Sequence, residues 1–163
     1  MLVLIVGSGR VGSAIAKAML ADGHEVSVLD EDPEAIALLE RGQTRGWEDL
    51  GGSFTVGTAL ELDALMEAGI ERADAFIAST DGDNTNLVIA QIAQRRFEIE
   101  RVVVRVLDPY RAQWYREQGL LTVCPTQVAI EMLQAAVREE TDTGEMSAIV
   151  REQLAANRTD GEG

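Results

Sequence analysis

The sequence predicts an α/β fold with a doubly wound sheet of six parallel strands, flanked by helices. Three observations predict it. Short apolar runs alternate with helical segments and short loops along the chain. The first run is apolar at every position, which is typical of a strand covered on both faces. A glycine pattern follows that run and leads directly into a helix. We assume right-handed crossovers throughout.

The elements follow in order along the chain. The strands are expected at residues 2–6, 26–29, 54–56, 75–78, 101–106 and 120–123. The helices are expected at residues 14–20, 34–40, 58–67, 87–95, 109–117 and 128–137. Asp22-Gly23 ends the first helix, Pro33 begins the second, and Asp108-Pro109 begins the fifth. Thr58 to Glu61 matches a capping box, which places the start of the third helix there.

The chain is predicted to form one nucleotide-binding domain, residues 1–140, followed by an acidic C-terminal helix and tail, 141–163, that is partly disordered. Within the tail, 146–156 has the pattern of an amphipathic helix. Residues 128–137 are apolar around most of a helix, which predicts a crossover or dimerisation helix. The alternative is an ordinary buried helix. Trp114, Tyr115 and Leu121 extend the same surface or belong to the core.

Composition excludes several functions. The 163 residues carry 28 acids and 14 basic residues, for a net charge of −14, which argues against nucleic-acid binding and against an anionic membrane surface. The first apolar run is too short for a signal peptide or a membrane span, so we expect no direct membrane insertion and a chain that begins near Met1. One cysteine allows no internal disulfide and suits a reducing cytosol. The acidic, lysine-poor composition suits either a high-salt cytoplasm or a GC-rich genome.

The glycine pattern is Gly7-x-Gly9-x-x-Gly12. Gly7 allows a tight turn, Gly9 lets the backbone approach a pyrophosphate, and Gly12 lets the helix pack closely on the strand. The helix N-terminus then offers N–H groups and a positive dipole end to an anion. Arg10 inside the loop can fold over a phosphate, or it is a solvated side chain at a helix start. A tight turn without a ligand is the alternative reading of the whole pattern.

Asp30 follows the second strand, 18 residues beyond Gly12, where an acid accepts hydrogen bonds from the ribose hydroxyls of an adenosine. Glu31 and Asp32 strengthen the repulsion of a 2′-phosphate. We therefore expect NAD(H), ADP or ATP as ligand, and not NADP. The alternative role for Asp30 is a helix cap ahead of Pro33.

No catalytic constellation is found. The only lysine is Lys17, in the first helix, so neither Tyr110 nor Tyr115 completes a Tyr-x-x-x-Lys relay. His24 lies in a turn, and Cys124 has no adjacent histidine. No residues have metal-ligand spacing; Asp81, Asp83, Asn84 and Asn86 share a loop that caps a helix or touches a ligand. A nucleotide site without catalytic groups indicates a sensor and not an enzyme.

The sequence resembles the N-terminal domain of RCK/KTN proteins, the Trk- and Ktr-type regulators of potassium channels and transporters. The resemblance covers roughly residues 1–140, and its motifs are 6–12, 23–26, 30–33, 68–75, 80–87 and 104–109. The arginine in the glycine loop and the Thr-Asp-rich loop before Asn86 are its most specific features.

The resemblance implies a Rossmann-like fold that binds NAD(H), ADP or ATP. It also implies a homodimer, often built into a ring, in the cytoplasm beneath a membrane potassium-translocating subunit or paired with a second RCK-type chain. The candidate nucleotide-binding residues are Gly7, Ser8, Gly9, Arg10, Val11, Gly12, Asp30, Glu31, Gly57, Thr58, Thr80, Asp81, Asn84 and Arg105. The alternatives are a small NAD-dependent oxidoreductase subunit and a regulator of a cation/proton antiporter.

The sequence departs from the family pattern at two positions and in its domain content. Gly57-Thr58 stands where the family often has Gly-Asp, and Pro125-Thr126 where it often has an acid after the proline. Many members also carry a second, C-terminal ligand domain. Either the sequence is a piece of a longer protein, or it is a single-domain subunit that pairs with another chain.

Overall fold

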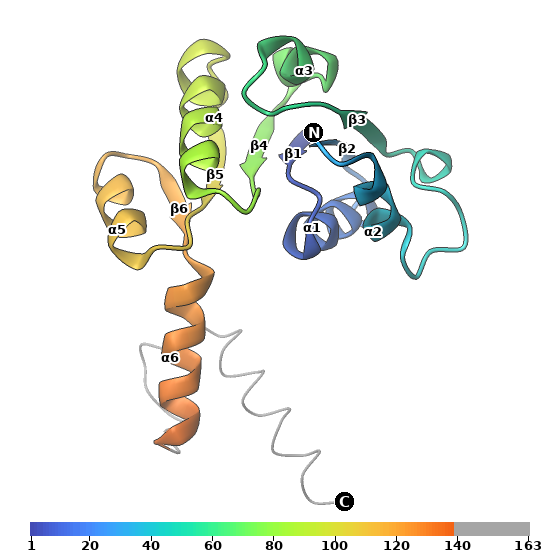
Figure 1. Cartoon of the computed structure of the whole chain (residues 1–163). Helices are drawn as coiled ribbons and strands as arrows, with labels where there is room; N and C mark the ends of the chain where they lie inside the picture. Colours follow the sequence, from blue (N-terminus) through green and yellow to red (C-terminus); the bar gives the residue numbers. More distant parts are fainter. Residues whose placement is uncertain (139–163) are drawn as a thin grey trace, which may run out of the picture. The chain divides into compact units, whose positions relative to one another are not determined.

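The computed structural model describes residues 1–138, which fall into two compact units, residues 1–123 and residues from 124 onward. The first unit is built on a parallel sheet with strand order β3-β2-β1-β4-β5-β6 (Figure 1). The strands are β1 (Leu2–Val6), β2 (Glu25–Asp30), β3 (Ser53–Val56), β4 (Ala75–Ala78), β5 (Arg101–Arg105) and β6 (Leu121–Val123). The predicted doubly wound sheet is therefore confirmed.

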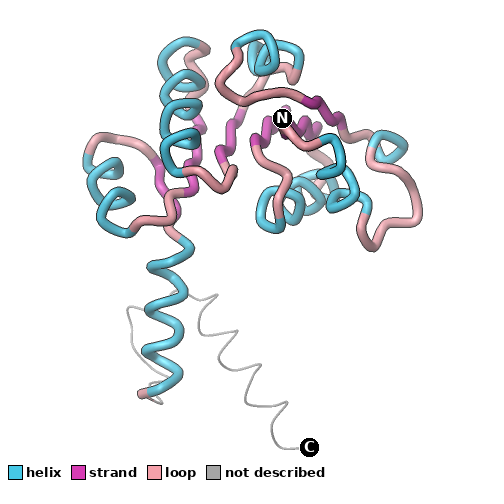
Figure 2. The backbone as a smooth tube through the Cα atoms, in the orientation of Figure 1, coloured by secondary structure: helices cyan, strands magenta, loops and turns pink. Residues whose placement is uncertain are grey.

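Five helices connect the strands, and within residues 1–138 one more helix follows β6. They are α1 (Arg10–Ala21), α2 (Ile36–Glu40), α3 (Leu62–Glu67), α4 (Asp83–Arg96), α5 (Pro109–Glu117) and α6 (Pro125–Val137). Short 3-10 turns stand at Pro33–Ala35, Glu48–Leu50 and Ile70–Arg72. The tube in Figure 2 shows α1 and α2 on one side of β1 and β2, with α3 on the other. The right-handed connections of a doubly wound sheet produce this division.

The two faces of the sheet explain the burial of its central strands. All five residues of β1 are buried, as its apolar run predicts. On one face Val26 and Val28 join a core that includes Ala16 of α1 and Leu39 of α2. On the other face Ser27 donates through Oγ to the carbonyl of Ala68, at 2.8 Å. Both layers of helices therefore hold β2, whose carboxyl end carries Asp30.

Three predicted starts of helices in the first unit are wrong. α1 begins at Arg10, four residues before its predicted start. The capping box at Thr58 does not form: α3 begins at Leu62, and Glu61 precedes it without a side-chain cap. The backbone N–H of Glu61 instead donates to the Thr58 carbonyl at 2.9 Å, which makes a turn before the helix. α4 begins at Asp83, a full turn earlier than predicted, behind Gly82. This difference in the start of α4 changes which of its side chains share a face.

The second helical segment is capped by Asp32 and not by Asp30. The backbone N–H of Glu34 donates to Oδ1 of Asp32 at 2.9 Å, and Pro33 follows that cap. The alternative role that the sequence left open for Asp30 is therefore filled by its neighbour, and the Asp30 carboxylate is available for another purpose.

The glycine-rich segment between α2 and β3 contains a buried tryptophan, Trp47, that no local sequence pattern predicted. Trp47 is fully buried, its Nε1 donates to the Ser53 carbonyl at 3.1 Å, and its ring stands where a Cβ on Gly52 would be. Glu40 accepts from the Trp47 backbone N–H at 3.1 Å. These contacts fix an otherwise irregular loop beside β3.

The second unit contains α6, which begins at Pro125, three residues before its predicted start. Cys124 precedes the helix, and its sulfur accepts from the backbone N–H of Gln127 at 3.4 Å. The apolar side chains of α6 are largely exposed, with Leu133 at 68% and Val137 at 84%. The predicted helix at 146–156 and the predicted boundary at 140 lie outside the described residues.

Candidate functional site

The main cleft lies at the carboxyl ends of the strands. The strand order reverses between β1 and β4, because the chain first adds strands on one side of β1 and then on the other. Ligands of doubly wound sheets bind at such a switch point. The cleft has a volume of about 1040 Å³. Twelve of the 14 candidate residues line it, and the two that do not are Gly12 and Asn84.

The three glycines of the loop between β1 and α1 have different surroundings. Gly7 has a φ of +97°, and a Cβ on it would lie 2.6 Å from the backbone nitrogen of Thr80. A Cβ on Gly12 would lie 1.8 Å from the Gly7 carbonyl oxygen, so the helix and the loop touch there. A Cβ on Gly9 would meet no atom within 4 Å. Gly7 and Gly12 are required by the protein's own packing, while Gly9 faces open space in the cleft.

Asp30 is oriented by two backbone N–H groups before any ligand arrives. Ser8, in the glycine loop, donates to Oδ2 at 2.5 Å, and Asp32 donates to Oδ1 at 3.0 Å. Each carboxylate oxygen retains a second lone pair that can accept another hydrogen bond. These two hydrogen bonds therefore fix the Asp30 carboxylate beside the glycine loop.

A third part of the cleft comes from the segments after β3 and β2. The backbone N–H of Gly57 donates to the Asp30 carbonyl at 2.9 Å, and a Cβ on Gly57 would lie 2.8 Å from that of Ala64 in α3. The chain then passes along the cleft through Thr58, Ala59 and Leu60. Thr58 is exposed, which leaves its side chain accessible from the cleft.

The loop after β4 is bound together by its own side chains. Asn86 in α4 accepts from both the backbone N–H of Thr80, at 2.9 Å, and its hydroxyl, at 2.7 Å. It also donates to the carbonyls of Thr80, at 2.9 Å, and Arg105, at 3.0 Å. The Arg105 side chain donates through Nη2 to the same Thr80 carbonyl at 2.5 Å. Asn86 is not among the 14 candidate nucleotide-binding residues, although its loop was predicted to cap a helix or touch a ligand. Its four hydrogen bonds organise this side of the cleft.

The first turn of α4 also holds the loop that follows β5. Asp83 accepts from the backbone N–H groups of Leu107, at 2.7 Å, and Asp108, at 3.1 Å. Asn84 accepts from Nη2 of Arg111 at 2.6 Å. The first turn of α4 thus holds the loops that follow β4 and β5 through Asp83, Asn84 and Asn86. Asn84 therefore contacts α5 and does not line the cleft. Gly12 does not line the cleft either, because it packs against the Gly7 carbonyl.

The charges around the cleft are unevenly placed. The acids that line it are Asp30, Glu31, Asp32, Glu34 and Asp81, and the arginines are Arg10, Arg41 and Arg105. Four of the five acids lie at the end of β2 or just after it, so an anionic group fits better near the N-terminus of α1, beside Arg10. Arg41 was not predicted, because nothing in the sequence fixed the path of the chain after α2. Lys17 donates through Nζ to the carbonyls of Leu38 and Arg41 and holds that path.

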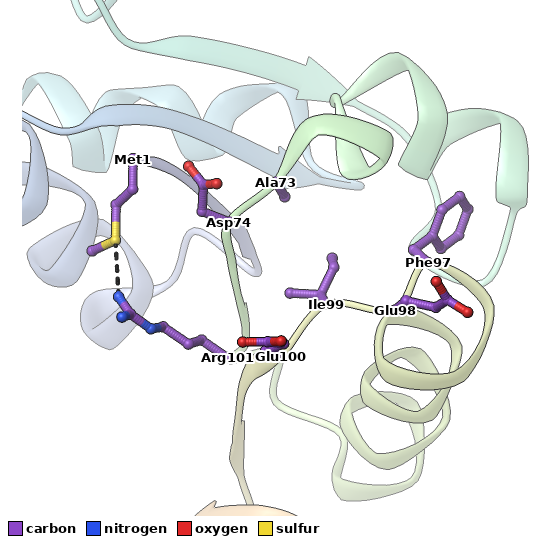
Figure 3. Close-up of a pocket in the computed structure, with 8 residues that line it drawn as sticks. All are labelled: Met1, Ala73, Asp74, Phe97, Glu98, Ile99, Glu100 and Arg101. Atoms are coloured by element: carbon purple, nitrogen blue, oxygen red, sulfur yellow. Dashed lines mark hydrogen bonds between the residues drawn. The ribbon is translucent and has the colours of Figure 1, made fainter.

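A second hollow lies at the opposite, amino-terminal edge of the sheet and is shown in Figure 3. It has a volume of about 490 Å³. Arg101 extends across it and donates to the Met1 sulfur at 3.6 Å. Its acids do not converge: among residues 1–138 no group of three or more metal-binding side chains is found. In the same part of the chain, no helix has both the length and the apolarity needed to cross a bilayer.

This strand order, with a glycine loop at the switch point, defines the Rossmann-like class of α/β domains. The chain belongs to the TrkA-N domain family, whose model matches residues 3–126. It is 40% identical over 133 residues to the Trk system potassium uptake protein TrkA of Streptomyces coelicolor. The match covers 81% of this chain and 56% of that relative, so the chain spans little more than half of the relative's length.

Two solved structures share the fold. The GsuK channel bound to NAD matches with a TM-score of 0.68 and 21% identity, over 85% of this chain and 23% of that one. The Kef CTD of Shewanella denitrificans in its AMP-bound form matches with a TM-score of 0.65 and 20% identity, over 99% and 93% of the two chains.

Proposed function

We propose that this chain is the nucleotide-binding part of a regulator of membrane potassium transport, and that its cleft binds NAD(H), ADP or ATP. The observation that carries the proposal is the Asp30 carboxylate, fixed by the Ser8 and Asp32 N–H groups beside the glycine loop. Family membership and the TrkA relative support the regulatory role. The NAD bound to the GsuK channel and the AMP bound to the Kef domain support the ligand class.

The cleft suggests one orientation for the ligand. The pyrophosphate lies over Gly9, where the backbone leaves room, and at the N-terminus of α1 with Arg10 beside it. The ribose hydroxyls donate to the free lone pairs of Asp30. The adenine then lies toward Ala59 and Leu60. Thr80 offers little to a ligand, because Asn86 takes both its N–H and its hydroxyl proton.

The regulatory step is a shift between conformations. A ligand changes such an equilibrium only by the difference between its affinities for the two states, and a tenfold difference corresponds to about 1.4 kcal/mol. Two nucleotides that share one cleft therefore act in opposite senses if they favour different states. In this proposal the protein regulates transport at the cytoplasmic face of the membrane, through a translocating partner. It does not act as an enzyme.

A panel of nucleotides tests the proposal directly. NAD, NADH, ADP or ATP at a hundredfold excess over its Kd is expected to raise the unfolding midpoint by about 5–10 °C. NADP is expected to raise it far less, because its 2′-phosphate meets Asp30 and Glu31. The measurement is a thermal-shift series in which NADP is added at the same concentration as NAD. Equal stabilisation by NAD and NADP would contradict the ribose assignment, and no stabilisation by any nucleotide would overturn the function.

We also propose that the protein is a homodimer joined through α6. Ile130, Leu133 and Val137 share one stripe of the helix and are 40%, 68% and 84% exposed. A contiguous apolar stripe of this kind is typical of an interface.

Replacing Leu133 by glutamate is expected to weaken the dimer by at least about 100-fold, since each subunit loses about 1.5–3 kcal/mol of apolar burial and gains a charge. Sedimentation velocity across a dilution series measures the change. Gln134→Glu adds the same charge to an exposed polar position of the helix and should leave the dimer intact. If both variants, or neither, dissociate, the stripe is not the interface.

A further inference from the structure

The Asn86 side chain is fully buried and uses its entire hydrogen-bonding capacity. Its Oδ1 accepts two hydrogen bonds from Thr80, and its Nδ2 donates one to the Thr80 carbonyl and one to the Arg105 carbonyl. A side-chain amide has two donor hydrogens and two acceptor lone pairs. All four are satisfied, so this side chain has one orientation and joins the carboxyl end of β4 to that of β5.

The Thr80 carbonyl connects this amide to a charged group of the cleft. It accepts from Nδ2 of Asn86 and also from Nη2 of Arg105. The Arg105 side chain lines the cleft. Its Nε is buried and has no hydrogen-bond partner among residues 1–138. Asn86 therefore holds the acceptor that fixes the Arg105 guanidinium beside the cleft.

We propose that Asn86 is a positioning residue for the phosphate end of the nucleotide, acting through the Thr80 carbonyl on the Arg105 guanidinium. The inference rests on the proposed function, because it assumes that the cleft binds a nucleoside diphosphate. Asn86 does not line the cleft and touches no ligand in this arrangement. Its effect is to keep a cation in the one place where it pairs with phosphate oxygens, which suits the fixed geometry of a guanidinium.

The proposal makes the effect of Asn86 depend on phosphate. Asn86→Asp keeps the shape but replaces Nδ2, which supplies both donor hydrogens, with one oxygen that faces the carbonyls of Thr80 and Arg105. It is expected to weaken ADP binding by about 10–100-fold, the range for a lost hydrogen bond to a charged group. Adenosine has no phosphate and is expected to bind within about threefold of wild type, since Asp30 holds its ribose. Isothermal titration with ADP and with adenosine measures both affinities.

A double-mutant cycle separates positioning from general damage. Arg105→Ala alone is expected to weaken ADP binding as much as Asn86→Asp does, and the double variant should be no weaker than Arg105→Ala to within about twofold. Losses that multiply in the double variant, or an equal loss for adenosine and ADP, would overturn the inference. Gln94→Glu makes the same amide-to-acid change at an exposed position of α4 and should bind ADP normally.

Two further arms keep the test decisive. If Asn86→Asp does not fold, Thr80→Val enters the same cycle with Arg105→Ala. It removes the hydroxyl that donates to Oδ1 of Asn86 and accepts from the backbone N–H of Gly82, and it leaves both Nδ2 bonds of Asn86 in place. Failure of the wild-type protein to bind ADP or any other adenine nucleotide would overturn the proposed function. Normal ADP binding by the wild type, together with a multiplicative cycle, would overturn only the role of Asn86.

Discussion

Gly12→Ala is expected to lower the free energy of unfolding by about 3 kcal/mol, the upper end of the range for an overpacked contact. The added Cβ would lie 1.8 Å from the Gly7 carbonyl oxygen and 2.8 Å from Oγ of Ser79. Because the Gly7 atom belongs to the backbone of a tight turn, α1 must move away from the loop. For a chain of this size, the unfolding midpoint should fall by about 6–12 °C. Thermal unfolding followed by circular dichroism measures it.

Gly9→Ala is the matched variant, since it makes the same change three residues earlier. No atom lies within 4 Å of a Cβ at that position, so the protein should unfold within about 1 kcal/mol of wild type. The methyl group enters the space assigned to the pyrophosphate, so ADP affinity should fall by at least about tenfold, or 1.4 kcal/mol. The pair thus separates a packing glycine from a ligand glycine. Equal loss of stability in both variants would contradict this distinction.

Asp30→Ala is expected to weaken NAD and ADP binding by at least about 100-fold, because two hydrogen bonds from the ribose to a charged acceptor are lost. It should also reduce the preference for NAD over NADP, since the charge that repels a 2′-phosphate is partly removed. Calorimetric titration with NAD, NADP and ADP gives all three affinities. The free protein should lose some stability as well, because the Ser8 and Asp32 N–H groups lose their acceptor.

Glu25→Ala provides the control for charge and location. Glu25 is exposed at the amino end of β2, the same strand that carries Asp30 at its carboxyl end. This variant removes one negative charge from the same strand without approaching the cleft, and it should bind NAD as the wild type does. If Asp30→Ala also binds NAD with wild-type affinity, the ribose does not lie at Asp30.

The sequence predicted the sheet well because each strand is a local pattern. The run at Leu2–Val6 and its glycine loop are contiguous, so the residues that build the loop could be recognised without knowing the rest of the fold. Asp30 was likewise predicted as a candidate from its position after a strand. The competing role as a helix cap could not be dismissed from sequence alone, because Asp32 lies only two residues away and has the same side chain. The structure settles the cap at Asp32.

The loop after β4 shows why the remaining site residues were harder to predict. With a helix expected from Leu87, Asn84 and Asn86 both fall in a loop and are equally eligible to touch a ligand. With α4 beginning at Asp83, they lie two positions apart on a helix and about 200° apart around its axis. One then contacts Arg111 and the other is buried against Thr80. A one-turn difference in the start of the helix therefore decides which of the two amides is buried against the loop after β4. Arg41 and Trp47 depended on the path of an irregular loop.

The two tryptophans of the chain give the protein a built-in pair of fluorophores. Trp47 is fully buried beside β3, whereas Trp114 on α5 is 54% exposed. Emission from the buried indole should be blue-shifted and shielded from a dissolved quencher, and emission from Trp114 should be red-shifted and readily quenched. They report on opposite ends of the strand order, β3 and α5–β6. Light from one chain, without any label, can therefore show which end of the sheet responds when a nucleotide enters.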